Sequence, residues 1–337
     1  MRKFTYWIVA IGILTMSGLL ATSSALASGK VIVYSSNQQQ QNDIMAAAFV
    51  KATGIKCEMV RAGSGVLIKR MKAEKNRPLG DVALGLSKII LENNMDLWEP
   101  YKIKDFAAYP EEYKDPNGMW LGKILHVMVF MYNTKLVPAA QAPKAWSDFL
   151  DPKWQDQVAF CNPNNAGSAY SQLSIMLSLW GDNEAGWKKA EKFLKQAKIT
   201  QQSSIVYTGV AGGEFPAGIT MEYAVHRLKK DGAPVEVVYP AEGTLAYTEG
   251  LAIIKGGPNR ENARKFMDWA TGVETRKQIL DQFLRRPARG DIDLGSLAPG
   301  MIPLATLNLL KNYDEDYWTK RRPEVLEKVK DILLRVK

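Results

Sequence analysis

The stretch from Lys30 to Val60, KVIVYSSNQQQQNDIMAAAFVKATGIKCEMV, places two short apolar runs on either side of a longer segment. The runs KVIVY and IKCEMV predict strands that are buried in a sheet. Between them we expect a helix from about Asn42 to Thr53, which Gly54 ends. A strand, a helix and a second strand in this order predict parallel strands joined by a crossover helix.

The alternation of strands and helices continues beyond this stretch. The segments VLIKRMKAEK and GDVALGLS, residues 66–75 and 80–87, predict another helix and a third strand. The segment ILHVMVFMYN, residues 124–133, is too apolar for a surface loop, so we expect it to cross into a second lobe. The segment LAYTEGLAIIKG, residues 245–256, then returns toward the first lobe.

The predicted fold class is therefore α/β, with two lobes that each contain a mainly parallel sheet flanked by helices. Two crossings join the lobes as a hinge, and ligands of such open sheets bind beyond the carboxyl ends of the strands. The expected boundaries are an N-terminal lobe of residues 28–130 and 248–300, a C-terminal lobe of residues 131–247, and C-terminal helices in residues 301–337 that pack on the lobes.

Residues 1–27 have the pattern of a secretory signal peptide. Arg2 and Lys3 precede an apolar run, and the small residues Ala25 and Ala27 suit cleavage after Ala27. The alternative is a membrane anchor, because the apolar run is nearly long enough to span a bilayer. The cleavage pattern favours export, and no cysteine follows the run to indicate a lipoprotein. We therefore expect a periplasmic protein.

The chain carries 44 basic and 35 acidic residues, a formal net charge of +9. Because the basic residues are spread out rather than clustered among aromatic residues, we expect no nucleic-acid partner. A mild positive field instead favours the capture of anions. The two histidines and two cysteines are too few for a typical zinc site, so we expect no metal and no cofactor. We expect a monomer in which Cys57 and Cys161 stay unpaired.

Small polar residues and glycines follow four of the predicted strands. Each group precedes an expected helix start, where free backbone N–H groups and a partial positive charge can hold an anion. The alternative is that these residues only cap helices, which serine, threonine and asparagine commonly do. The last group lies in SSIVYTGVAGGEF, residues 203–215, which we expect to be a turn. The candidate residues are Ser35, Ser36 and Asn37; Ser64 and Gly65; Asn164, Gly167 and Ser168; and Thr208 and Gly209.

Further candidate contacts carry charge or a phenol. In ITMEYAVHR, Glu222 could accept hydrogen bonds from an ammonium group or a sugar hydroxyl, and Tyr223 could donate one. The segment YTEG supplies Tyr247 and Glu249 near the returning crossing. The segment FLRRPARGD, residues 283–291, supplies three arginines that could bind an anion, although an arginine run beside proline is usually solvated.

The sequence gives little evidence of a catalytic site. No G-x-S-x-G elbow is present, because Ala62 stands where its outer glycine would be, and no P-loop lysine pattern occurs. Neither histidine lies in a segment that also offers a nucleophile and an orienting acid. We therefore expect a binding protein and not an enzyme.

Several segments together resemble the bacterial extracellular solute-binding proteins of ABC importers: the run from Lys30 to Lys75, GDVALG, PKAWSDFLDPKWQDQVAF and GLAIIKGGPNRENARKFMDWATG. The resemblance is to the branch that contains ferric-ion, sugar-phosphate and aminoethylphosphonate binders. It implies a hinged receptor that closes on a solute and delivers it to an inner-membrane permease. Closure is expected because contacts from both lobes stabilise the closed state.

The resemblance also bears on the solute. Ferric binders of this branch use a histidine, a glutamate and a tyrosine pair, and the matching positions here are Gln38, the neighbourhood of Leu86, Glu222 and Tyr223. Only the second tyrosine matches, and Fe³⁺ needs several anionic oxygen ligands. The serine and glycine loops instead resemble those of phosphate and phosphonate binders, so we expect a small organic phosphate or phosphonate. The alternatives are ferric capture, with Tyr247 as a further ligand, and a secreted phosphate-ester hydrolase.

Overall fold

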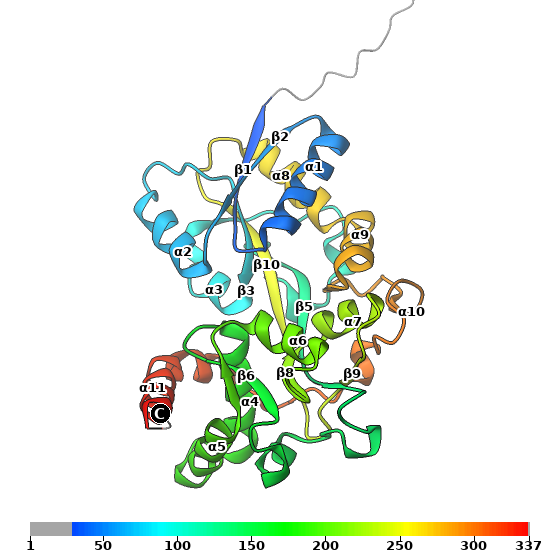
Figure 1. Ribbon diagram of the computed structural model, residues 1–337. Coiled ribbons are helices and arrows are strands. Elements are labelled where there is room, and N and C mark those ends of the chain that lie inside the picture. Colours follow the sequence, from blue (N-terminus) through cyan, green and yellow to red (C-terminus); the bar gives the residue numbers. More distant parts are fainter. Residues whose placement is uncertain (1–28, 336–337) are drawn as a thin grey trace, which may run out of the picture.

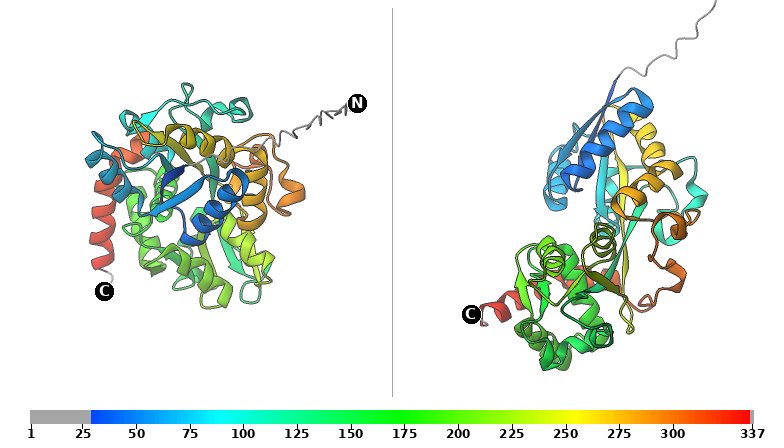
Figure 2. Two further views of the ribbon diagram at one scale, coloured as in Figure 1. Left: turned by 90° about the horizontal axis from the view of Figure 1, so that it is seen from above. Right: turned by 45° about the vertical axis from the view of Figure 1, so that its right-hand side comes forward.

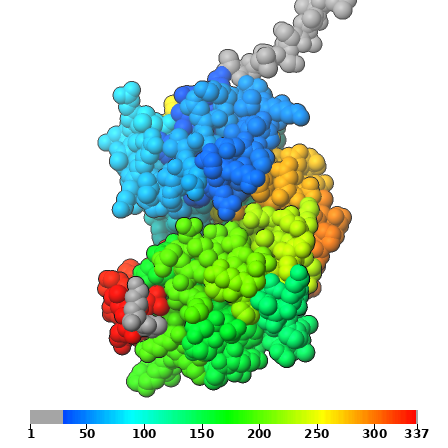
Figure 3. Space-filling model, in the orientation of Figure 1, coloured from blue at the N-terminus to red at the C-terminus, as the bar shows by residue number. Residues whose placement is uncertain are grey.

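The computed structural model describes residues 29–335 of the 337-residue chain. The expected signal peptide, residues 1–27, lies outside the described residues. Within residues 29–335, no helix is long and apolar enough to cross a membrane. The chain folds into two lobes, one above the other in Figure 1, which meet along a narrow indented boundary in the space-filling view (Figure 3).

The first lobe begins with the predicted alternation of strands and helices. Its strand β1 pairs in parallel with β2 on one side and with β3 on the other. The helix before β2 begins slightly earlier than predicted, and Gly54 ends it in the left-handed conformation at φ 71°. The elements are β1 (Lys30–Ser35), α1 (Gln39–Thr53), β2 (Lys56–Arg61), α2 (Ser64–Ala73), β3 (Val82–Ser87), α3 (Lys88–Glu92) and β4 (Trp98–Glu99).

Two long strands run between the lobes (Figure 1). Strand β5 (Leu121–Asn133) is buried along its whole length. Its first half pairs antiparallel with β10 (Ala246–Ile254), which in turn pairs with β3. Its second half pairs with β8 (Ala217–Met221) and β9 (Val235–Val238) of the other lobe. One continuous strand therefore belongs to both sheets, in the order β2-β1-β3-β10-β5-β8-β6-β7.

The second lobe has its own parallel core strands. Strand β6 pairs in parallel with β7 and β8, and a large apolar cluster surrounds them. The elements are η5 (Trp146–Leu150), β6 (Val158–Cys161), α4 (Gly167–Trp180), α5 (Glu184–Gln196), β7 (Lys198–Thr200), α6 (Ser203–Gly212) and α7 (Glu222–Lys230). The mixed α/β class with sheets flanked by helices is thus as predicted.

The glycine-rich segment 203–215 is not the expected turn, because Ser203–Gly212 forms helix α6. Val206 and Val210 are buried against β8, where Gly218 leaves room: a Cβ there would lie 2.8 Å from Val206 Cγ1. Apolar packing against the sheet therefore outweighs the low helix propensity of the glycines. The helix ends where Gly213 takes a φ of 81°.

The chain passes between the lobes once more near its end. After α8 (Arg260–Thr271) and α9 (Val273–Phe283), strand β11 (Arg286–Pro287) pairs with β5, and α10 (Leu294–Leu297) follows. Helix α11 (Glu315–Leu334) then packs on the second lobe through Trp318, Val325, Val329 and Ile332. Two further views show this terminal helix at the outside of the second lobe (Figure 2).

Candidate solute-binding site

The two crossing strands carry a buried charged cluster where the lobes meet. Glu249 of β10 accepts from Lys123 of β5 through one carboxylate oxygen, and His126 Nε2 lies 2.9 Å from the other. Burial alone would raise the Glu249 pKa, but Lys123 and His126 outweigh it and hold that pKa well below its usual range. Burial lowers the pKa of the fully buried Lys123 to about 8, against the pull of Glu249. Both groups are therefore charged at neutral pH.

His126 links this ion pair to Arg285. Burial lowers the His126 pKa despite the nearby carboxylate, so the ring is neutral at pH 7. Its Nε2–H then donates to Glu249, and Nδ1 accepts from Arg285 Nη1 at 3.5 Å. The ring of Tyr247 stacks on His126 with centroids 4.8 Å apart, and Tyr223 packs edge-on at 5.9 Å. The phenols and the imidazole thus form one aromatic wall of the cluster.

Beside this aromatic wall, the neighbours Arg285 and Arg286 contact the neighbours Tyr223 and Glu222. Arg285 Cζ lies 3.6 Å from the Tyr223 ring centroid, and Arg285 Nε has no hydrogen-bond partner within the described part of the chain. Arg286 forms a bidentate ion pair with Glu222, at 2.9 and 2.6 Å. Tyr239 also donates to Glu222, at 2.6 Å. Both oxygens of the Glu222 carboxylate are therefore occupied by internal partners.

The end of β1 and the start of α1 reach the same cluster. Lys123 Nζ lies 3.4 Å from Asn37 Oδ1, while Asn37 Nδ2 is buried without a partner in residues 29–335. In the part of the chain that the structure describes, no side-chain hydrogen bond from Gln38 caps α1, so the first N–H groups of this helix stay available. Gly85 permits the approach, because its φ is +84° and a Cβ there would lie 2.6 Å from Asn37 Oδ1.

Arg276 adds a second guanidinium that has no carboxylate partner within residues 29–335. It lies in the first turn of α9 and is 1% exposed, and none of its three side-chain nitrogens has a hydrogen-bond partner among the described residues. Burial lowers its pKa to about 10, which leaves it protonated at neutral pH. Its charge and that of Arg285 both act on Lys123. The cluster therefore holds three cations, Lys123, Arg276 and Arg285, against the single carboxylate of Glu249.

The first lobe holds five of the sequence-predicted site residues at the ends of its strands. Ser35 Oγ donates to Asn42 Oδ1 at 2.7 Å, and Ser36 donates to the carbonyl of Gly85. Both hydroxyls thus hold loops together. Asn37 contacts the charged cluster, whereas Ser64 and Gly65 begin helix α2, with Gly65 exposed.

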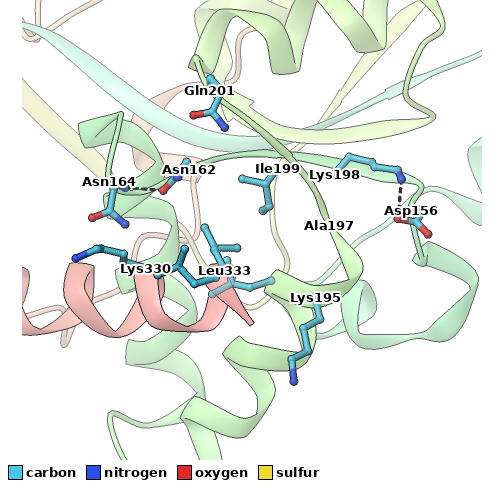
Figure 4. A pocket seen from close by; sticks show the side chains of 12 residues that line it. Asp156, Asn162, Asn164, Lys195, Ala197, Lys198, Ile199, Gln201, Lys330 and Leu333 are labelled. Carbon is cyan, nitrogen blue, oxygen red and sulfur yellow. Dashed lines mark hydrogen bonds and ion pairs between the residues drawn. The ribbon is translucent and has the colours of Figure 1, made fainter. Parts of the chain in front are cut away.

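The second-lobe residues are more dispersed. Gly167 and Ser168 begin α4, as expected for a helix start. Thr208 and Gly209 do not precede a helix, because they lie inside α6; Thr208 donates to the carbonyl of Ser204, and Gly209 packs against Phe215. Asn164 donates to the Leu326 carbonyl of α11 and lines an outer groove (Figure 4).

Sequence reasoning named Glu249 and the arginines of residues 283–291 as candidate contacts, but it did not select Lys123, His126 or Arg276. Lys123 and His126 are the two basic residues in the otherwise apolar strand β5. A basic residue in a strand that is buried on both faces is costly unless it is paired or functional, so the pattern itself carried a signal. Arg276 gives no comparable signal, because an arginine in the first turn of an amphipathic helix is usually solvated.

Two lobes joined by crossing strands, with a polar cluster enclosed between them, define a protein that binds a solute at a hinge. The family model described as "Bacterial extracellular solute-binding protein" matches residues 90–321. The chain belongs to this family, the solute receptors of ABC importers, as the resemblance predicted.

Relatives and a solved structure agree with this assignment. An uncharacterized protein of Haemophilus influenzae is 31% identical and covers 77% of this chain and 78% of its own. A putative 2-aminoethylphosphonate-binding periplasmic protein of Salmonella typhimurium is 23% identical, with 81% and 83% covered. An Fe(3+)-binding periplasmic protein of Serratia marcescens is 24% identical, with 78% and 80% covered. The periplasmic binding protein AfuA from Actinobacillus pleuropneumoniae, with fructose-6-phosphate bound, superimposes with a TM-score of 0.75 at 25% identity, covering 90% and 98%.

Proposed function

We propose that this protein is an exported, periplasmic receptor that closes on a small organic phosphate or phosphonate and passes it unchanged to an inner-membrane permease. The observation that carries this proposal is the buried surplus of positive charge that Arg276 and Arg285 place beside the Lys123–Glu249 pair of the crossing strands. Each buried charge without a partner lowers the free energy of unfolding by several kcal/mol. A bound anion would offset that cost, so the charged cluster favours an anion as its ligand.

The hydrogen-bonding groups point to the same class of solute. The atoms of Asn37, Arg276 and Arg285 that have no partner within residues 29–335 are all N–H donors, and none is an acceptor. A phosphoryl or phosphonyl group offers three acceptor oxygens, and arginine suits it geometrically. Further contacts in this proposal come from Tyr223 and Tyr247, and from the free N–H groups that begin α2 and α4, at Ser64, Gly65, Gly167 and Ser168.

The names of the relatives support an anionic solute of this kind, since one relative is named for 2-aminoethylphosphonate and the AfuA structure holds fructose-6-phosphate. Binding without turnover fits a receptor, and we propose no catalytic residue. We also propose that the signal peptide is cleaved after Ala27 and that the mature protein is a monomer.

Ferric capture is the second candidate, because one relative is named as an Fe(3+)-binding protein. Three features weigh against it here. The Glu222 carboxylate is occupied by Arg286 and Tyr239. Burial raises the pKa of Tyr247, which disfavours the phenolate that iron binds. A surplus of buried positive charge also repels a cation.

The test is a thermal-shift and calorimetric panel on the mature protein with inorganic phosphate, fructose 6-phosphate, simple alkylphosphonates and ferric citrate. We expect at least one phosphorylated or phosphonate probe to raise the melting temperature, since a ligand at 100 times its Kd stabilises by about 2.7 kcal/mol. Lys123→Met should weaken that binding. Lys69→Met, on the exposed side of α2, is the matched control. A visible charge-transfer band with ferric citrate, and no response to any phosphorus compound, would reject the proposal.

A further inference from the structure

The carboxylates around the charged cluster are already used. Glu249 accepts from Lys123 and His126. Glu222 accepts from Arg286 and Tyr239 and is 2% exposed. Neither group offers a free acceptor to a solute, so the expectation that Glu222 binds a cationic substituent does not fit its contacts.

Two other carboxyls, those of Glu92 and Glu315, lie where α3 of the first lobe approaches α11. Lys88 interacts electrostatically with both Glu92 of α3 and Glu315 of α11. Burial nevertheless raises the pKa of both carboxyls. Neither carboxyl belongs to the hydrogen-bond chain that runs from Asn37 through Lys123, Glu249 and His126 to Arg285. Within residues 29–335, an ammonium group held beside this chain would meet the guanidinium groups of Arg276 and Arg285, and the nearby carboxylates of Glu249 and Glu222 already have internal partners.

We infer that the solute carries no ammonium group, and that it is an organic phosphate or phosphonate whose second polar group is a hydroxyl or a carboxylate. This inference rests on the proposed function and specifies the solute class of the same site. A carboxylate would use the second unpaired cation, because the cluster holds two more positive charges than negative ones. A hydroxyl would accept from the buried N–H donors that have no partner in residues 29–335.

Three phosphonates that differ only in their terminal group test this inference. 2-Aminoethylphosphonate, 2-hydroxyethylphosphonate and 3-phosphonopropionate share a phosphonate and a two-carbon spacer, and they end in an ammonium, a hydroxyl and a carboxylate. Titration calorimetry of the mature wild-type protein should give an affinity for the ammonium compound at least tenfold weaker than for the better of the other two. Tighter binding of 2-aminoethylphosphonate would overturn the inference and leave the proposed function intact.

A variant at Arg286 provides a second test. Arg286→Met would release the Glu222 carboxylate, so the affinity ratio should move toward the ammonium compound by about tenfold. An unchanged ratio in a folded variant would contradict the role given to Glu222. Because this variant leaves a buried carboxylate unpaired and could fail to fold, the wild-type comparison decides the inference by itself. If none of the three phosphonates, fructose 6-phosphate or inorganic phosphate binds, the proposed function fails and the inference fails with it.

Discussion

Arg285 lies over the ring of Tyr223, with Cζ 3.6 Å from the ring centroid, although the two residues come from different elements and are far apart in the sequence. Arg286 and Glu222, their immediate neighbours, form a bidentate ion pair. The start of α7 in the second lobe therefore holds the segment that leaves α9 of the first lobe. One arginine is neutralised by this arrangement, and the other keeps Nε without a partner in the described structure.

Arg285→Met should separate binding from stability. Removing one of the surplus cations should weaken phosphate or phosphonate binding by about 30-fold or more, since a truncated charged contact costs about 2 kcal/mol or more. The same change should lower the melting temperature of the ligand-free protein only slightly, because the loss of a buried charge without a carboxylate partner offsets the loss of the His126 hydrogen bond and the Tyr223 contact. Calorimetry and thermal unfolding measure the two effects. Arg77→Met, at an exposed position of the same lobe, should alter neither, and a large loss of stability in Arg285→Met would contradict the unpaired state.

Arg276→Met should stabilise the ligand-free protein. A fully buried guanidinium with no hydrogen-bond partner in residues 29–335 is unfavourable, and an apolar side chain of similar volume should raise the free energy of unfolding by about 1–4 kcal/mol. Urea unfolding with and without a bound probe measures this, and the variant should gain less from the probe than the wild type does. Destabilisation of the ligand-free variant would show that Arg276 is paired in solution.

Glu222→Gln should be strongly destabilising. It removes the negative charge that faces the buried Arg286 guanidinium, and breaking a buried ion pair typically costs about 3–5 kcal/mol. Chemical unfolding of the ligand-free protein provides the measurement. Glu261→Gln removes an exposed carboxylate that pairs with the half-buried Arg264, and it should change stability by less than about 1 kcal/mol. Equal effects of the two changes would mean that solvent reaches the Glu222 pair.

Several of these residues could be anticipated from the sequence and others could not. The apolar runs and the turn at Gly54 predict the parallel start of the first lobe, and the continuous apolar run of β5 predicts a crossing strand. The convergence of Asn37, Lys123 and Arg276 depends on strand register and helix rotation. Periodicity does not supply either quantity, so the proximity of these side chains follows only from the folded structure.

The serine and glycine loops illustrate a second limit. Ser35 and Thr208 have the residue types expected of an anion site, yet their hydroxyls satisfy Asn42 and the Ser204 carbonyl. A small hydroxyl residue hydrogen-bonds locally as readily as it binds a ligand. The predicted turn at 203–215 failed for a related reason, because burial of its apolar face decided the local structure. Residue type alone therefore does not distinguish a ligand contact from a local hydrogen bond.

Lys123 should make anion binding depend on pH. Its folded-state pKa of about 8 lies below the ordinary lysine value, so the unfolded chain binds more protons between pH 8 and about 10.5, and ligand-free stability should rise over that window. A bound anion favours the charged amine, so binding at pH 8 should take up protons and affinity should fall as the pH rises above 8. Titration calorimetry in buffers of different ionisation enthalpy measures the uptake. Proton uptake that persists in Lys123→Met would assign it to another group.

Gly85→Ala should disturb the site through the backbone. Gly85 has a φ of +84°, and a Cβ would lie 2.6 Å from Asn37 Oδ1 and 2.9 Å from Ser36 Oγ, so the variant should displace Asn37 from Lys123 as well as strain the chain. Gly232→Ala is the matched control, because its φ is +85° and nothing lies within 4 Å of its Cβ. The control should lose only the free energy that a non-glycine residue needs to adopt a positive φ, about 1–2 kcal/mol. We expect Gly85→Ala to lose more stability in urea unfolding and also to weaken probe binding in calorimetry, because the Asn37 amide no longer faces the anion. Equal losses of stability with unchanged affinity would show that Asn37 does not contact the solute.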